Sequence, residues 1–172
     1  MDPSRERTPT IDGGCANPLP ATGPFAELQP AARERLAEAG RCVEKRLGDY
    51  LTVQGQRHRA LALVLSGRVS ITVHAHGDTL DLAMFGAGDV VGEMSLLDPQ
   101  AASATSRVAS GSAKLWIIDG AAFDRFVEQD PVSGFALIRG LARVLCQRVR
   151  GDTRCMLRRA AELRAHFLDM DY

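Results

Sequence analysis

The chain has 172 residues, enough for one domain with terminal appendages that buries about two thirds of its unfolded surface. Its 21 basic residues balance 21 acidic ones, so overall charge favours neither nucleic acid nor an anionic membrane as a partner. Four scattered cysteines without CxxC spacing predict a reduced, cytoplasmic protein without disulfides, and the lack of a long apolar run predicts no membrane segment.

Residues 1–24 form the first segment, which we expect to be a disordered leader. This segment is rich in proline, glycine, threonine and charge and has no hydrophobic period. We expect the fold to begin near Phe25. A helix is predicted over residues 29–43, where apolar residues recur at helical spacing. These residues are Ala32, Leu36, Ala39 and Val43.

Short apolar runs alternate with glycine turns through the middle of the chain. The runs predicted as strands are residues 50–53, 61–65, 69–73, 80–84, 90–91 and 114–118. Their spacing predicts a mainly β, α+β fold over residues 25–130: an eight-stranded jelly-roll β-barrel (double-stranded β-helix) with an N-terminal helix and C-terminal helices. Val69, Ile71 and Val73 alternate with polar residues, as in a half-buried strand. A hairpin turn is predicted at Gly77-Asp78.

A helical period returns after Asp119, breaks at Asp130-Pro131 and continues in a long helix over residues 131–172. The apolar stripe of that helix comprises Ile138, Leu141, Leu145, Val149, Met156, Ala160, Leu163 and Phe167, with Asp152 interrupting it. A small barrel cannot cover a stripe of this length, so we expect a dimerisation or output element that meets a second copy or a protein partner. Eight arginines between Arg139 and Arg164 predict a solvated helix face or a surface for an acidic partner.

Residues 85–98, FGAGDVVGEMSLLD, combine a glycine-rich turn, a Gly-Glu pair and a short predicted helix. This segment resembles the phosphate-binding cassette of cyclic nucleotide-binding domains. Gln54-Gly55 and the run LSGRV at residues 65–69 also match that family's barrel glycines, so the resemblance covers roughly Phe25 to Arg148. It implies a regulatory or sensor module rather than an enzyme, with cAMP or cGMP as effector and no other cofactor.

The resemblance also implies which residues bind a ligand. Backbone N–H groups of Gly92, Glu93, Met94 and Ser95 would face the phosphate, as expected for donors at the start of a helix. Glu93 would accept a hydrogen bond from the ribose 2′-hydroxyl, although the helix dipole also stabilises a carboxylate at this position without any ligand. Ser103 and Thr105 would line the phosphate side.

One position departs from the family. Most nucleotide-binding members have an arginine nine residues after the glutamate, where this chain has Ala102. A charged hydrogen bond is worth about 1.5–3 kcal/mol, so its loss predicts binding weaker by about one to two powers of ten. Arg139 and Arg143 of the last helix are candidates to reach the pocket instead. Arg107 is expected to lie on an exposed barrel strand.

Three alternatives fit parts of the sequence. A degenerate barrel without a nucleotide would act by dimerising or docking on another protein. A catabolite-activator-type transcription regulator would need a helix-turn-helix after the long helix, so we expect no sequence-specific DNA binding. A cupin-like metal enzyme is suggested by His74, His76 and Asp81, but the histidines continue a polar strand face and no second motif follows. We therefore expect no metal site and no catalytic residues.

Overall fold

The computed structural model describes residues 19–75 and 77–168. Its helices are η2 (Gly23–Phe25), α1 (Pro30–Ala39), α2 (Glu93–Leu97), α3 (Gly120–Gln129) and α4 (Pro131–Leu168). Its strands are β1 (Arg41–Arg46), β2 (Tyr50–Thr52), β3 (Ala60–Ser66), β4 (Val69–Ala75), β5 (Asp78–Phe85), β6 (Val90–Val91), β7 (Thr105–Val108) and β8 (Ser112–Asp119).

Two antiparallel sheets make up the β portion, in the orders β1-β8-β3-β6 and β2-β7-β4-β5. Alternate residues of the strands point between the sheets, because side chains in a strand alternate in direction. The core enclosed there consists of Val43, Ala62, Val64, Val69, Val91, Val108, Ala113 and Leu115. The predicted fold class, an eight-stranded jelly roll with flanking helices, is therefore confirmed for the described residues.

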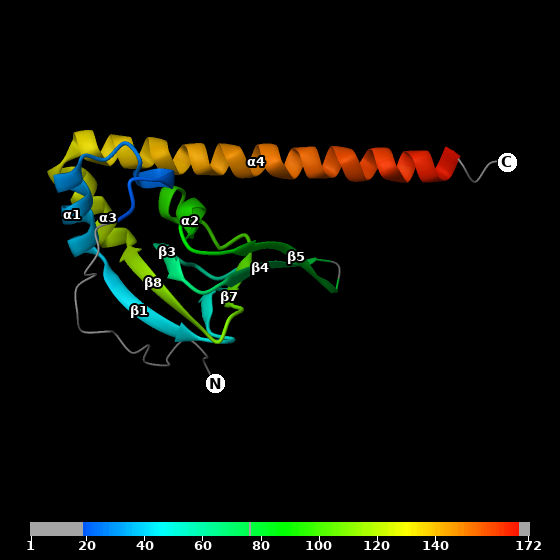
Figure 1. The fold of residues 1–172 in the computed structure, drawn as a ribbon, viewed down its shortest axis with the longest axis horizontal. Coiled ribbons are helices and arrows are strands. Elements are labelled where there is room, and N and C mark those ends of the chain that lie inside the picture. Colours follow the sequence, from blue (N-terminus) through cyan, green and yellow to red (C-terminus); the bar gives the residue numbers. More distant parts are fainter. Residues whose placement is uncertain (1–18, 76, 169–172) are drawn as a thin grey trace.

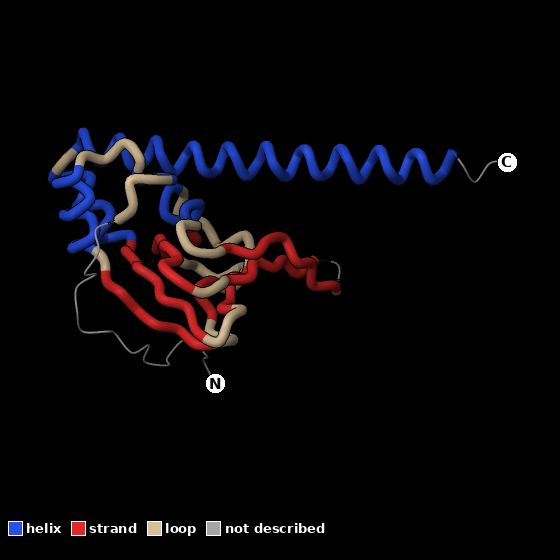
Figure 2. The backbone as a smooth tube through the Cα atoms, in the orientation of Figure 1, coloured by secondary structure: helices blue, strands red, loops and turns tan. Residues whose placement is uncertain are grey.

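A second core lies between the outer face of the β1-β8-β3-β6 sheet and the helices. Leu61 and Leu63 of β3 alternate with the inward residues and meet α1, α3 and α4 there. Trp116 is fully buried in this layer, and its indole Nε1 donates a hydrogen bond of 3.0 Å to the carbonyl of Ala37. Burying a large apolar side chain of this kind adds about 1.5–3 kcal/mol to the free energy of unfolding. Figure 2 shows α1 and α3 grouped at one end of the strands, below the start of α4.

The fold begins earlier than Phe25. Leu19 is 3% exposed and Pro24 is buried in η2, so residues 19–24 pack against the domain rather than belonging to a leader. Residues 1–18 of the expected leader lie outside the described residues.

The predicted helix over residues 29–43 is wrong beyond Ala39. Gly40 packs against the indole of Trp116, where a Cβ would lie 2.6 Å from Cζ2, so the backbone changes course at this point. The next six residues form β1 and pair with β8. Cys42 in this strand is disulfide-bonded, contrary to the expectation of reduced cysteines, whereas Cys146 is free and exposed.

Helix α4 runs without a break through Gly151 and extends past both sheets (Figure 1). Its early turns are covered, since Leu137 and Leu141 are at most 1% exposed. Its later apolar residues are not covered: Val149 is 62% exposed and Met156 is 71% exposed. No helix in the described part of the chain has both the length and the apolar character needed to cross a membrane.

Candidate functional site

The segment that resembles the cassette is fixed along β3, from Val64 near the end of the strand to Ala60 at its start. The N–H of Gly88 donates to the carbonyl of Val64 at 2.9 Å, and the N–H of Val64 donates to the carbonyl of Asp89 at 2.9 Å. Gly92 caps α2 with a φ of 90°, a conformation that favours glycine. A Cβ at Gly92 would overlap the carbonyl oxygen of Ala60, so only glycine brings α2 this close to β3.

Glu93 begins α2 and is 4% exposed. Its Oε1 accepts a hydrogen bond from Nη1 of Arg148, which comes from the middle of α4. Nη2 of the same arginine donates to the carbonyl of Val90 at 2.8 Å. The guanidinium also lies 4.4 Å from the centroid of the Phe85 ring. Residues from β5, β6 and α2 therefore meet at one guanidinium, which α4 supplies.

This ion pair is mostly withdrawn from solvent, with side-chain exposures of 26% for Arg148 and 6% for Glu93. Removing one member of a buried pair typically costs about 3–5 kcal/mol, because the other charge is left uncompensated. The ring of Phe85 adds a cation–π attraction. The pair consequently ties α4 to the cassette.

The other predicted site residues lie around α2, but their hydroxyls already have partners. Ser95 is buried, and its Oγ donates to the carbonyl of Gly92 at 3.4 Å. Ser103 Oγ lies 3.7 Å from the Sδ of Met94, whose side chain is exposed. Thr105 begins β7, and its Oγ1 accepts a hydrogen bond of 3.1 Å from the N–H of Gln54. The structure brings residues 92–95 and Ser103 together and turns Thr105 toward β2.

Ala102, where the family has arginine, is held by its backbone. Its N–H donates to the carbonyl of Gln56 at 2.9 Å, and its own carbonyl accepts from the N–H of Gly55 at 2.8 Å. The residue is 9% exposed. Arg107 is exposed on β7, as expected. Neither position places a cation at the cassette.

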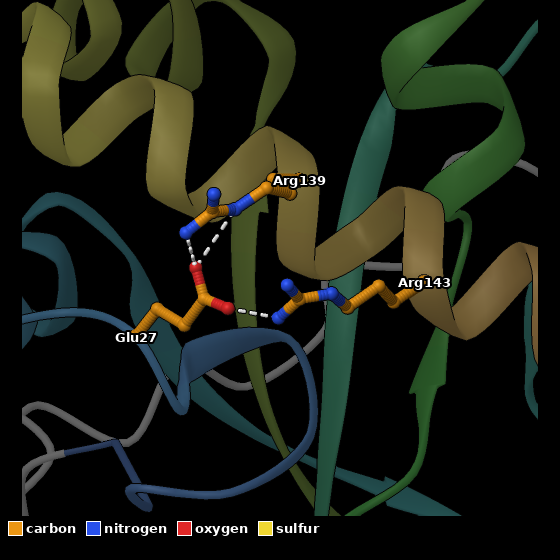
Figure 3. A network of polar contacts seen from close by, with 3 residues as sticks. All are labelled: Glu27, Arg139 and Arg143. Atoms are coloured by element: carbon orange, nitrogen blue, oxygen red, sulfur yellow. Dashed lines mark hydrogen bonds and ion pairs between the residues drawn. The ribbon is translucent and has the colours of Figure 1, made fainter.

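Arg139 and Arg143 were candidates for the cassette, but the structure places them elsewhere (Figure 3). Both bind the carboxylate of Glu27, between η2 and α1, and Nε of Arg139 donates to it at 2.9 Å. Hydrogen bonds from Arg139 and then from Arg143 lower the pKa of Glu27. These arginines hold the N-terminal segment against α4, so their assignment as pocket candidates is corrected.

Arg148 is the site residue that the sequence analysis did not single out. A signal for it exists, because Leu141, Leu145 and Arg148 follow one another at steps of four and three along one helix face. Because arginine is almost never buried without a partner, an arginine in line with buried apolar positions is a candidate for an ion pair.

A hollow of about 490 Å³ lies against the inner face of β1, β3 and β8. Its lining residues are Arg41, Val43, Lys45, Tyr50, Leu51, His58, Ala60, Ala62, Val91 and Ile117. None of the six predicted ligand residues lines this hollow. One lining residue, His58, borders the cassette, because its Nε2 would lie 3.6 Å from a Cβ at Gly92. Burial lowers the pKa of His58, against a raising effect of its hydrogen bond with the Ala60 backbone.

The structure describes His74 and Asp81, two of the three residues suggested for a metal site. No group of three histidine, cysteine, aspartate or glutamate side chains in the described part of the chain has a metal-binding arrangement. His74 Nδ1 lies 3.3 Å from the hydroxyl of Thr79 on the β4–β5 hairpin, and His76 lies outside the described residues.

Comparisons with known proteins agree on one family. The family model "Cyclic nucleotide-binding domain" matches residues 43–130. A cyclic nucleotide-binding domain from Methylobacillus flagellatus has the same fold, with a TM-score of 0.73 at 24% identity over 78% of this chain and 76% of that one. The catabolite activator protein of Thermus thermophilus matches with a TM-score of 0.68 at 27% identity over 79% of this chain. This chain spans 62% of that protein.

A third structure extends the same comparison. The N-terminal domain of a transcriptional regulator from Streptomyces coelicolor matches at 28% identity with a TM-score of 0.65, over 77% of this chain and 91% of that one. No curated protein sequence matches the chain significantly.

Proposed function

The chain belongs to the family of cyclic nucleotide-binding domains, and from this premise we propose that it is a sensor module that binds a cyclic nucleotide or a similar small anionic effector. The ligand would bind at the cassette, with its ribose on Glu93 and its phosphate near the backbone of residues 92–95. Helix α4, which is tied to Glu93, would carry the signal.

The buried carboxylate of Glu93 is the observation that carries this proposal. Burying an ion pair is costly, and well-packed apolar residues of similar volume are often as stable or more stable. Stability alone is therefore a weak reason for a carboxylate at 4% exposure. Its position matches the family's ribose ligand, which supports a binding role.

A nucleotide-free module is the second candidate. Ala102 favours it, because the family's phosphate-binding charge is missing there and the backbone at this position is engaged with Gln56. Such a protein would act only by dimerising or by docking on another protein.

Thermal unfolding with cAMP and with cGMP tests the proposal. A ligand at about 100 times its Kd stabilises by about 2.7 kcal/mol, which raises Tm by about 5–10 °C for a domain of this size. We expect this shift in the wild type and its loss in Glu93→Ala, each measured against the same variant without ligand. Glu38→Ala, at an exposed position on α1, is the matched control and should shift like the wild type. No shift at millimolar ligand would favour the nucleotide-free candidate.

Dimerisation through α4 is the output that we propose. Val149, Met156 and Leu157 are exposed beyond the last described contact of α4 with the cassette, and a second copy would cover them. Ending the chain after Val149 should give a monomer that keeps Arg148, whereas the full chain should be a dimer by size-exclusion chromatography with light scattering. A dimer that survives the truncation would refute this role of α4.

A further inference from the structure

We propose that Arg148 is the ligand-binding cation of this domain, so that α4 supplies the positive charge that is missing at Ala102. The inference rests on the proposed function and adds a residue to the same site. It also gives the ligand a direct contact with the output helix.

The guanidinium of Arg148 has donors left for a ligand. Arginine carries five N–H donors in a planar fork. The described contacts use Nη1 toward Glu93 and Nη2 toward the carbonyl of Val90. Nε and one hydrogen on each of the other two nitrogens have no described partner. The side chain is 26% exposed, so part of it is accessible to a small molecule.

Glu93 offers a complementary acceptor beside this cation. Among the described residues only its Oε1 accepts a hydrogen bond, which leaves Oε2 for a ligand hydroxyl. A carboxylate oxygen next to a guanidinium suits a molecule that carries a hydroxyl close to an anionic oxygen. A ribose phosphate has both groups, and guanidinium binds phosphate through paired hydrogen bonds. Both protein charges can therefore keep their mutual contact while the ligand binds.

The other arginines near the cassette are less suited to this role. Arg139 and Arg143 are engaged with Glu27. Arg57 is the nearest rival by backbone position, because it forms a β-bridge with Ala101, but it is exposed and its side chain has no described partner to hold it. Arg148, by contrast, is held by a carboxylate, a carbonyl and an aromatic ring.

This arrangement fixes the direction of the signal. A ligand that contacts both Glu93 and Arg148 binds more tightly when α4 is docked on the cassette. Linkage then requires the ligand to stabilise the docked helix by the same factor. Amide hydrogen exchange around residues 144–150 should therefore slow when the ligand is bound.

Calorimetric titration of cAMP into matched variants tests the proposal. We expect Arg148→Ala to bind about ten to a hundred times more weakly than the wild type, the loss expected for one charged hydrogen bond. Arg148→Lys should fall between them, because lysine keeps the charge but loses the fork. Arg150→Ala, at an exposed position on the same helix, should bind like the wild type. Adding Ala102→Arg to Arg148→Ala should restore affinity.

Other outcomes separate this inference from the proposed function. If Arg148→Ala binds as tightly as the wild type or more tightly, the arginine is an intramolecular lock and the inference is overturned while the proposed function stands. Loss of binding in Arg57→Ala with retention in Arg148→Ala would also overturn it. If neither the wild type nor any variant binds cAMP or cGMP, the proposed function itself fails. Thermal unfolding of each ligand-free variant shows that it is folded.

Discussion

Replacing Gly92 by alanine is expected to lower the free energy of unfolding by about 2–5 kcal/mol. The left-handed backbone, with φ of 90°, costs about 1–2 kcal/mol for alanine. The added Cβ would also overlap the carbonyl of Ala60, and overpacking of this kind costs about 1–3 kcal/mol. Because α2 would have to move, Glu93 should also lose its contact with Arg148, and the proposed binding of cAMP should be lost with it.

Gly88→Ala separates these two costs. Gly88 has a φ of 94°, but a Cβ there would meet nothing within 4 Å. This variant should therefore lose only about 1–2 kcal/mol. Urea unfolding of both variants gives the comparison. If both variants lost the same free energy of unfolding, the close approach of Gly92 to β3 would not contribute to stability.

Replacing Gly140 by alanine is expected to lower the free energy of unfolding by about 1–3 kcal/mol, although alanine is the better helix former. Gly140 lies where α4 crosses η2, and an added Cβ would lie 2.8 Å from the carbonyl carbon of Pro24 and closer still to its oxygen. The helix would be pushed away from the N-terminal segment. The contacts of Glu27 with Arg139 and Arg143 should weaken as a result.

Gly151→Ala is the control on the same helix, with the opposite expected sign. A Cβ at Gly151 would meet nothing within 4 Å. Alanine should therefore stabilise α4 by about 0.5–1 kcal/mol through helix propensity alone. Urea unfolding of the two variants measures both values. A Gly140→Ala protein as stable as the wild type would contradict the close packing of α4 on η2.

Most strands could be predicted because their apolar residues are contiguous or alternate clearly. Strand β1 could not, since its inward positions are Arg41, Val43 and Lys45, with a single apolar residue among them. The spacing of Leu36, Ala39 and Val43 also continues the helical period of α1. The change of structure at Gly40 depends on its contact with Trp116, more than 70 residues away in the chain, which no local pattern contains.

The candidate site could be predicted in part. The glycines and Glu93 are close in sequence, so the cassette is visible as a motif. Arg148 is 55 residues from Glu93, and an arginine in a basic helix is ordinarily predicted to be solvated. The direction of the hydroxyls of Ser95 and Thr105 was also beyond prediction, because each is set by a local backbone partner that appears only in the folded chain.

If α4 carries the signal as proposed, its continuous part beyond Arg148 would act as a lever. About 20 residues of α4 follow the contact with the cassette, which at 1.5 Å per residue is an arm of about 30 Å. A tilt of about 10° at Arg148 would move the far end by about 5 Å. A rearrangement of one ion pair, too small to disturb either sheet, would thus become a displacement as large as a whole turn of helix at the tip.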